Sequence, residues 1–141
     1  MEITYKFISG CVAALVALFA PIAPLIICTL LFIAIDFISG ILADRKMARD
    51  EGRQWFFESG RAWHTILKAG LAIVALGMSW LIDSCILQFL HLNLAQLFAG
   101  FTCGIELWSF LENAAQLSDA PLFRWLRQFV HRRIRKEVAH E

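Results

Sequence analysis

The chain has 141 residues, of which 59% are hydrophobic and 18% charged, with a formal net charge of +1. A single soluble domain of this size cannot bury so much apolar side chain, so the composition argues against a soluble protein and favours a membrane protein. Lys and Arg are absent from residues 7–44 and 69–123, and each gap can hold about two helices of about 20 residues, the length that crosses a bilayer.

The first apolar run, residues 7–43, is too long for one membrane helix. Pro21 and Pro24 break it, because proline lacks an amide donor and disfavours helix in the residue before it. We expect helices over about 7–20 and 24–43, and only the second is long enough to span a bilayer. Whether the first also crosses, and therefore on which side the N-terminus lies, is left open by the sequence.

The second of these helices carries a small, polar face. Asp36, Ser39 and Gly40 recur at steps of three and four, which places them on one side of a helix. This face favours a subunit contact or a wall that meets water. The alternative is an aspartate close to the membrane surface that is simply solvated.

A polar connector follows over residues 44–61 and contains Trp55, an aromatic residue typical of a membrane interface. The next predicted helix, residues 62–90, has Lys68 close to its beginning. Lys68 can pair with Asp36 if the two helices are adjacent, or it can extend its amine to the lipid headgroups. Both interpretations stay open at the level of sequence.

The last predicted membrane helix, residues 94–117, combines small and polar positions. Gly100 and Gly104 have the spacing that lets two membrane helices approach closely. The helix has no Lys or Arg to neutralise its acids, so we expect those acids to be unpaired and to face a protein partner or water. The alternative is a monomeric bundle that satisfies its polar groups internally. The polar positions are Glu106, Ser109, Glu112 and Asn113.

The tail, residues 122–141, has the pattern of a basic amphipathic helix, suited to lie on an anionic membrane surface. The alternative is a solvated tail without a specific contact, and nucleic acid is not an expected partner. The positive-inside rule places both the connector and the tail in the cytoplasm. The residues expected to anchor the tail at the membrane are Arg124, Arg127, Arg132, Arg133, Arg135 and Lys136.

No catalytic constellation is recognisable in the sequence. The four histidines are dispersed, the four cysteines contain no C-x-x-C pair, and no Gly-rich phosphate loop occurs. We therefore expect a protein that is not an enzyme and that uses neither a cofactor nor a metal ion. The prediction is an all-α integral membrane protein with three to four transmembrane helices and a basic amphipathic C-terminal helix, in a single membrane domain, residues 1–141.

Three segments together resemble the phage holin family that includes toxin-secretion holins, sometimes called holin family 4. They are residues 35–43 with Asp36 and Gly40, residues 58–83 with Lys68 and Asp83, and residues 106–114, whose E-x-x-S-x-x-E-N pattern is the most specific of the three. The resemblance covers about residues 25–130. The chain departs from the family at 118–121, where a glycine is usual.

The resemblance implies a multi-pass protein of the bacterial inner membrane, and the positive-inside rule places its C-terminus in the cytoplasm. Such a protein forms a homo-oligomer in the lipid and opens a lesion through which an endolysin or a toxin leaves the cell. Asp36, Ser39, Gly40 and the small and polar positions of helix 94–117 would then serve as oligomer contacts or as the pore wall. The alternatives are a non-lytic membrane scaffold or adaptor that docks a cytoplasmic or phage-assembly partner, and a channel or transporter for small solutes.

Overall fold

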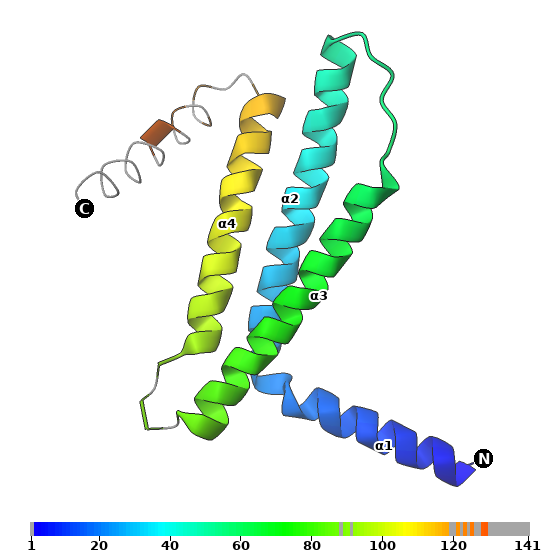
Figure 1. Ribbon diagram of the computed structural model, residues 1–141, viewed down its shortest axis with the longest axis vertical. Helices are drawn as coiled ribbons and strands as arrows, with labels where there is room; N and C mark the ends of the chain where they lie inside the picture. The colour runs from blue at the N-terminus through cyan, green and yellow to red at the C-terminus, as the bar shows by residue number, and fades with distance from the viewer. Residues whose placement is uncertain are drawn as a thin grey trace.

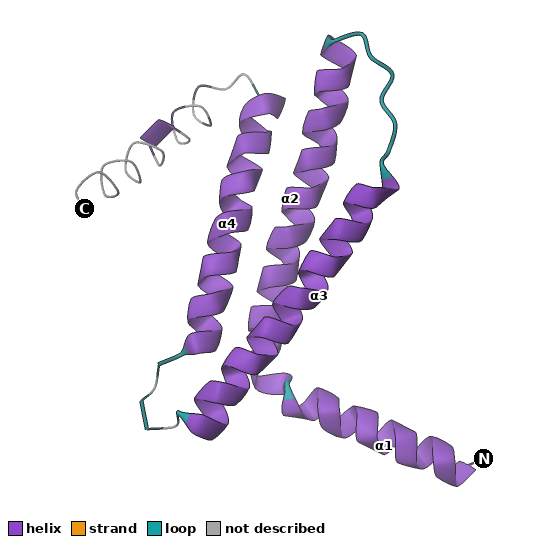
Figure 2. Ribbon diagram, in the orientation of Figure 1, coloured by secondary structure: helices purple, strands orange, loops and turns teal. Residues whose placement is uncertain are grey.

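The protein is a helical bundle with one helix that projects from it (Figures 1 and 2). The computed structural model describes residues 2–87, 89, 90, 92–118, 121, 123, 125, 128 and 129. Its elements are α1 (Glu2–Leu18), a 3-10 turn η1 (Ala20–Ile22), α2 (Ala23–Asp50), α3 (Ser59–Leu81), a π-helical turn η2 (Ile82–Ile86) and α4 (Leu94–Leu117). The regular structure of the described residues is entirely helical.

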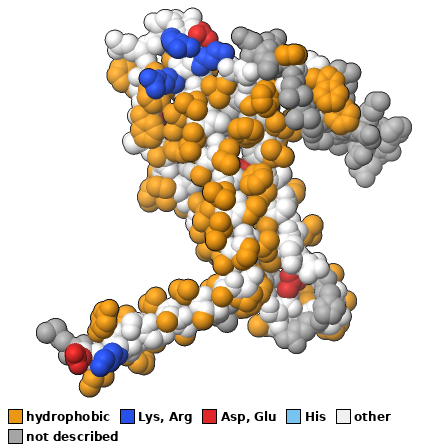
Figure 3. Space-filling model, turned by 180° about the vertical axis from the view of Figure 1, so that it is seen from behind, with side chains coloured by type: hydrophobic (Ala, Val, Ile, Leu, Met, Phe, Trp, Pro, Cys, Tyr) orange, Lys and Arg blue, Asp and Glu red, His pale blue; other side chains and the backbone are white. Residues whose placement is uncertain are grey.

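Three helical segments are long and apolar enough to cross a membrane. They are Ala20–Asp50, Ser59–Ile86 and Leu94–Leu117. The predicted all-α membrane fold is therefore confirmed, and α1 is a fourth helix in addition to these three spans. Apolar side chains cover most of the visible surface between the two ends of the bundle, as Figure 3 shows.

The bundle core is built mainly from small residues. α2 packs most extensively against α4, and α3 crosses both of them (Figure 1). Ile33 and Leu76 are among the few large side chains that are fully buried. Small side chains let helix backbones approach closely, which is how helices associate where lipid removes the hydrophobic driving force. The small buried residues are Thr29, Ser39, Ala43, Ala48, Ala72, Gly77, Ala95, Ala99 and Ala114.

α1 leaves the bundle at the end opposite the connector (Figure 1). The Pro21 and Pro24 positions lie in the first turns of η1 and α2, where proline is tolerated because no intrahelical amide bond is lost. At this corner Phe19 packs 5.9 Å from Trp80, measured between ring centroids. A Cβ added to Gly77 would lie 3.2 Å from the Phe19 ring, so glycine at this position makes room for the corner.

α2 continues beyond its expected end at residue 43 to Asp50. It stops at Gly52, which has a positive φ of 66°. The amide of Gly52 donates to the Arg49 carbonyl, and that of Arg53 to the Ala48 carbonyl, the paired bonds of a Schellman helix end. The polar connector between helices is therefore residues 51–58, shorter than the expected 44–61.

The hairpin between α3 and α4 is closed by a side chain from η2. Asp83 Oδ2 accepts a hydrogen bond of 3.1 Å from the amide of Ala95, in the first turn of α4. Asn93, with a φ of 52°, precedes that turn in the left-handed conformation. A carboxylate at a helix N-terminus satisfies a free amide and interacts well with the helix dipole.

The anchoring residues predicted for the tail lie outside the described residues. They are Arg124, Arg127, Arg132, Arg133, Arg135 and Lys136. Trp125 and Phe129, which are described, stack with ring centroids 5.4 Å apart.

Candidate functional site

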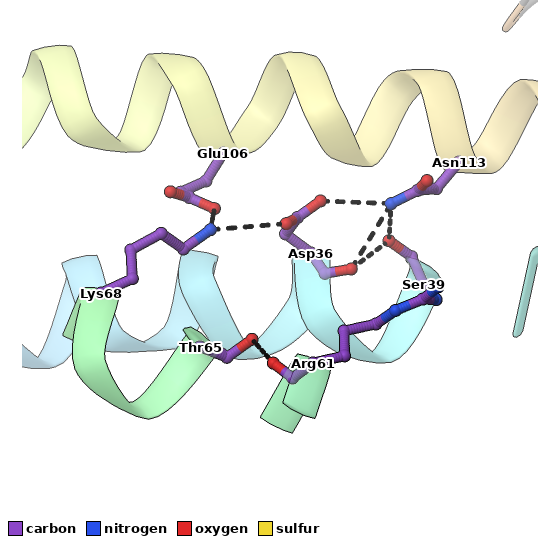
Figure 4. A network of polar contacts seen from close by, with 7 residues as sticks. All are labelled: Asp36, Ser39, Arg61, Thr65, Lys68, Glu106 and Asn113. Carbon is purple, nitrogen blue, oxygen red and sulfur yellow. Dashed lines mark hydrogen bonds and ion pairs between the residues drawn. The ribbon is translucent and has the colours of Figure 1, made fainter. Parts of the chain in front are cut away.

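Five polar side chains from three helices meet inside the bundle, and we call them the polar cluster (Figure 4). α2 supplies Asp36 and Ser39, α3 supplies Lys68, and α4 supplies Glu106 and Asn113. The polar cluster therefore joins α2, α3 and α4 through side-chain contacts.

Lys68 is the only cation of the polar cluster, and it contacts two carboxylates. Its Nζ donates to Glu106 Oε2 at 2.8 Å and lies 3.7 Å from Asp36 Oδ2. The side chain of Glu106 is 4% exposed, that of Asp36 14% and that of Lys68 46%. A carboxylate without a partner is costly in an apolar environment, so both acids depend on this amine.

Asn113 links α4 to α2 through its amide. Its Nδ2 donates to Ser39 Oγ at 3.0 Å and to Asp36 Oδ1 at 3.2 Å, and it lies 3.4 Å from the Asp36 carbonyl. Ser39 Oγ in turn donates to that carbonyl at 2.9 Å. A Cβ added to Gly40 would lie 3.4 Å from Asn113 Nδ2, so the glycine leaves space for the amide.

A groove of about 360 Å³ runs along α3 and ends at Lys68. It is lined by Glu58, Gly60, Arg61, His64 and Thr65, between the connector and Lys68. Lys68 is therefore reachable by water from the connector end, whereas Glu106 behind it is shielded.

The structure pairs an acid that was expected to be unpaired. The expectation for Glu106 was wrong, because the lysine that neutralises it lies on α3 and not in its own helix. The pair between Lys68 and Asp36, one of two interpretations of the sequence, is confirmed. This region of the bundle thus satisfies polar groups internally.

The remaining predicted positions of α4 lie elsewhere on the helix. Gly100 and Gly104 are exposed, and a Cβ added to either would meet nothing within 4 Å in the described chain. Ser109 and Glu112 are half-buried, and Glu112 takes part in a polar interaction. Of the nine predicted positions, Gly100 and Gly104 are therefore on the exposed surface of the protomer, and the others are buried or half-buried.

Two polar contacts at the connector end were not predicted from the sequence. Lys46 Nζ donates to the carbonyls of Gln116 and Leu117, at 3.0 and 3.1 Å, and so caps α4. Asp44 Oδ2 accepts from Trp55 Nε1 at 3.2 Å and from Arg61 at 3.3 Å. Placing the end of α2 at residue 43 concealed both, because it assigned Asp44 and Lys46 to a loop.

Within the described part of the chain, no group of three His, Cys, Asp or Glu side chains is placed to hold a metal ion. The four cysteines, Cys11, Cys28, Cys85 and Cys103, are free.

Three apolar spans that hold an ion-paired cluster between them define a multi-pass helical membrane protein. Residues 8–132 match the bacteriophage holin family, and the chain belongs to that family. Searches of curated proteins and of solved structures each gave no match.

Proposed function

We propose that the protein is a non-enzymatic holin: it forms a homo-oligomer in the bacterial inner membrane and permeabilises it, so that an endolysin or a toxin can leave the cytoplasm. Membership in the bacteriophage holin family supports this proposal. The observation that carries it is the polar cluster, because charged groups between membrane spans mark a functional site. The basic connector end then lies in the cytoplasm, as the positive-inside rule requires.

The lesion is formed between copies of the chain. The interior of one protomer is filled by Leu76, Ile33 and the polar cluster, which leaves no room for the passage of a protein. Lateral association needs a helix face that other helices of the protomer leave uncovered. The Gly100 and Gly104 face of α4 meets this condition.

The polar cluster supplies the wall of the lesion when α2 and α4 separate. Its carboxylates and amide are paired in the closed protomer, where they satisfy one another. Once the helices separate, water can replace these internal partners. Asp36, Ser39, Glu106 and Asn113 are then pore-wall residues, and Gly100 and Gly104 are oligomer contacts.

A substitution confined to the uncovered face tests this assignment. We expect G100L/G104L to insert and fold normally, because a Cβ added at either position meets nothing within 4 Å in the described protomer, but to lose cross-linked oligomers and to delay lysis strongly. G70L is the matched control, since Gly70 is also an open glycine but lies on α3. Normal oligomers and unchanged lysis timing in G100L/G104L would show that this face is not the contact.

A further inference from the structure

A groove of about 670 Å³ lies at the connector end of the bundle, between the ends of α2 and α4. The extension of α2 to Asp50 puts Leu42, Arg45, Lys46 and Arg49 on one helix face, and the connector adds Arg53 and Trp55. Leu117 of α4 completes the lining. Figure 3 shows several basic side chains gathered at one end of the bundle and another at the far end of the projecting helix α1.

The cations of this basic groove are only partly neutralised. Arg53 pairs with Glu51 at 2.9 Å, and Arg49 lies 3.9 Å from Asp50 in an exposed pair. Arg45 is exposed and has no ion pair or hydrogen bond within the described part of the chain. The groove therefore has a positive potential and a free guanidinium that can bind an anionic oxygen ligand bidentately.

The lining changes from polar to apolar toward the membrane. Leu42 is 47% exposed in the groove, and Leu117 lies beside it. Trp55 is fixed by its hydrogen bond to Asp44, and tryptophan is typical of the headgroup level. A ligand that fits has an anionic head and a hydrocarbon chain.

We propose that the basic groove binds the phosphate headgroup of an anionic phospholipid, with Arg45 and Arg49 as its main ligands and an acyl chain along Leu42 and Leu117. Basic pockets at the ends of membrane helices suit such headgroups. Lys46 is already occupied by the α4 carbonyls, so it contributes charge more than a direct contact. The proposal requires insertion of the three spans and is independent of lysis.

Native mass spectrometry of the purified full chain, with added phosphatidylglycerol or phosphatidylcholine, tests the proposal. We expect the chain to retain phosphatidylglycerol preferentially and R45Q/R49Q to bind it about 30-fold more weakly. R45K/R49K, which keeps both charges but loses the bidentate guanidinium contact, should bind more weakly than the unchanged chain and more tightly than R45Q/R49Q. K6E lowers the net charge by the same two units at an exposed position of α1, far from the groove, and should leave the retained lipid in place.

Equal retention of the two lipids, or equal losses in R45Q/R49Q and K6E, would overturn the proposal. Glycerol 3-phosphate at millimolar concentration distinguishes a lipid site from a site for soluble phosphate. Because the acyl chain contributes to binding, it should fail to displace the lipid. Displacement would assign the groove to a soluble phosphate compound and would also contradict the proposal.

Discussion

At the scale of single residues, the protein depends on Lys68. With both carboxylates ionised, one amine faces Asp36 and Glu106, and the cluster carries one negative charge in excess. Removing either acid leaves a neutral pair, whereas removing the lysine leaves two neighbouring carboxylates without a cation. Loss of Lys68 should therefore lower the stability of the fold more than loss of Asp36 or Glu106.

A double-mutant cycle at Lys68 and Glu106 measures this difference. K68M should lower the free energy of unfolding by about 1–3 kcal/mol, less than for a fully buried pair because Lys68 is half exposed. E106M should cost less than K68M, and K68M/E106M should be more stable than K68M. Reversible unfolding in mixed detergent micelles gives all four values. Additive effects, or a larger cost for E106M, would contradict the assigned pairing.

The residues of the polar cluster could be predicted from sequence, but their partners could not. Asp36 and Glu106 are conspicuous because each is an acid in an apolar helix. The pairing of Glu106 with Lys68 depends on how α3 crosses α4, which local spacing does not define. The sequence allowed a pair between Asp36 and Lys68 because both lie toward the connector, Asp36 near the end of its predicted helix and Lys68 near the beginning of the next.

At the scale of elements, the position at which α2 ends determines whether the basic groove forms. The end of α2 could have been predicted more accurately, because Gly52 follows a run of helix-forming residues and glycine is common just past a helix end. Charge composition favoured a loop from residue 44 instead. That choice concealed the basic groove, which exists only because Arg45 and Arg49 lie on the same helix face.

A cross-link between α2 and α4 tests whether these helices separate during permeabilisation. Cys103 Sγ lies 3.9 Å from Thr29 Oγ1, so T29C in a C28S background places two thiols side by side in the bundle. Oxidation should form the disulfide and block lysis, and a reductant should restore it. The same variant carrying C103S is the control and should lyse under both conditions. Normal lysis with a complete cross-link would show that α2 and α4 stay together.

At the scale of the whole molecule, composition and the spacing of charges predicted the class of fold. The gaps without Lys or Arg, residues 7–44 and 69–123, indicate the membrane segments. The span Leu94–Leu117 lies inside a gap, and the other two spans each overlap a gap and extend into the basic region around the connector. The course of α1 could not be predicted, because its direction is set by the proline turn and by Phe19 packing at Gly77 and Trp80. Nor does local sequence reveal which faces of α4 are covered, since coverage depends on α2 and α3.

The most direct test of holin function is inducible expression in a bacterium that carries a cytoplasmic reporter enzyme and a co-expressed endolysin. Membrane potential, reporter release and culture turbidity are followed together. We expect normal growth, then abrupt depolarisation with release of the reporter and lysis that requires the endolysin. An intact membrane potential despite verified insertion, or depolarisation without the escape of either protein, would contradict the proposed function.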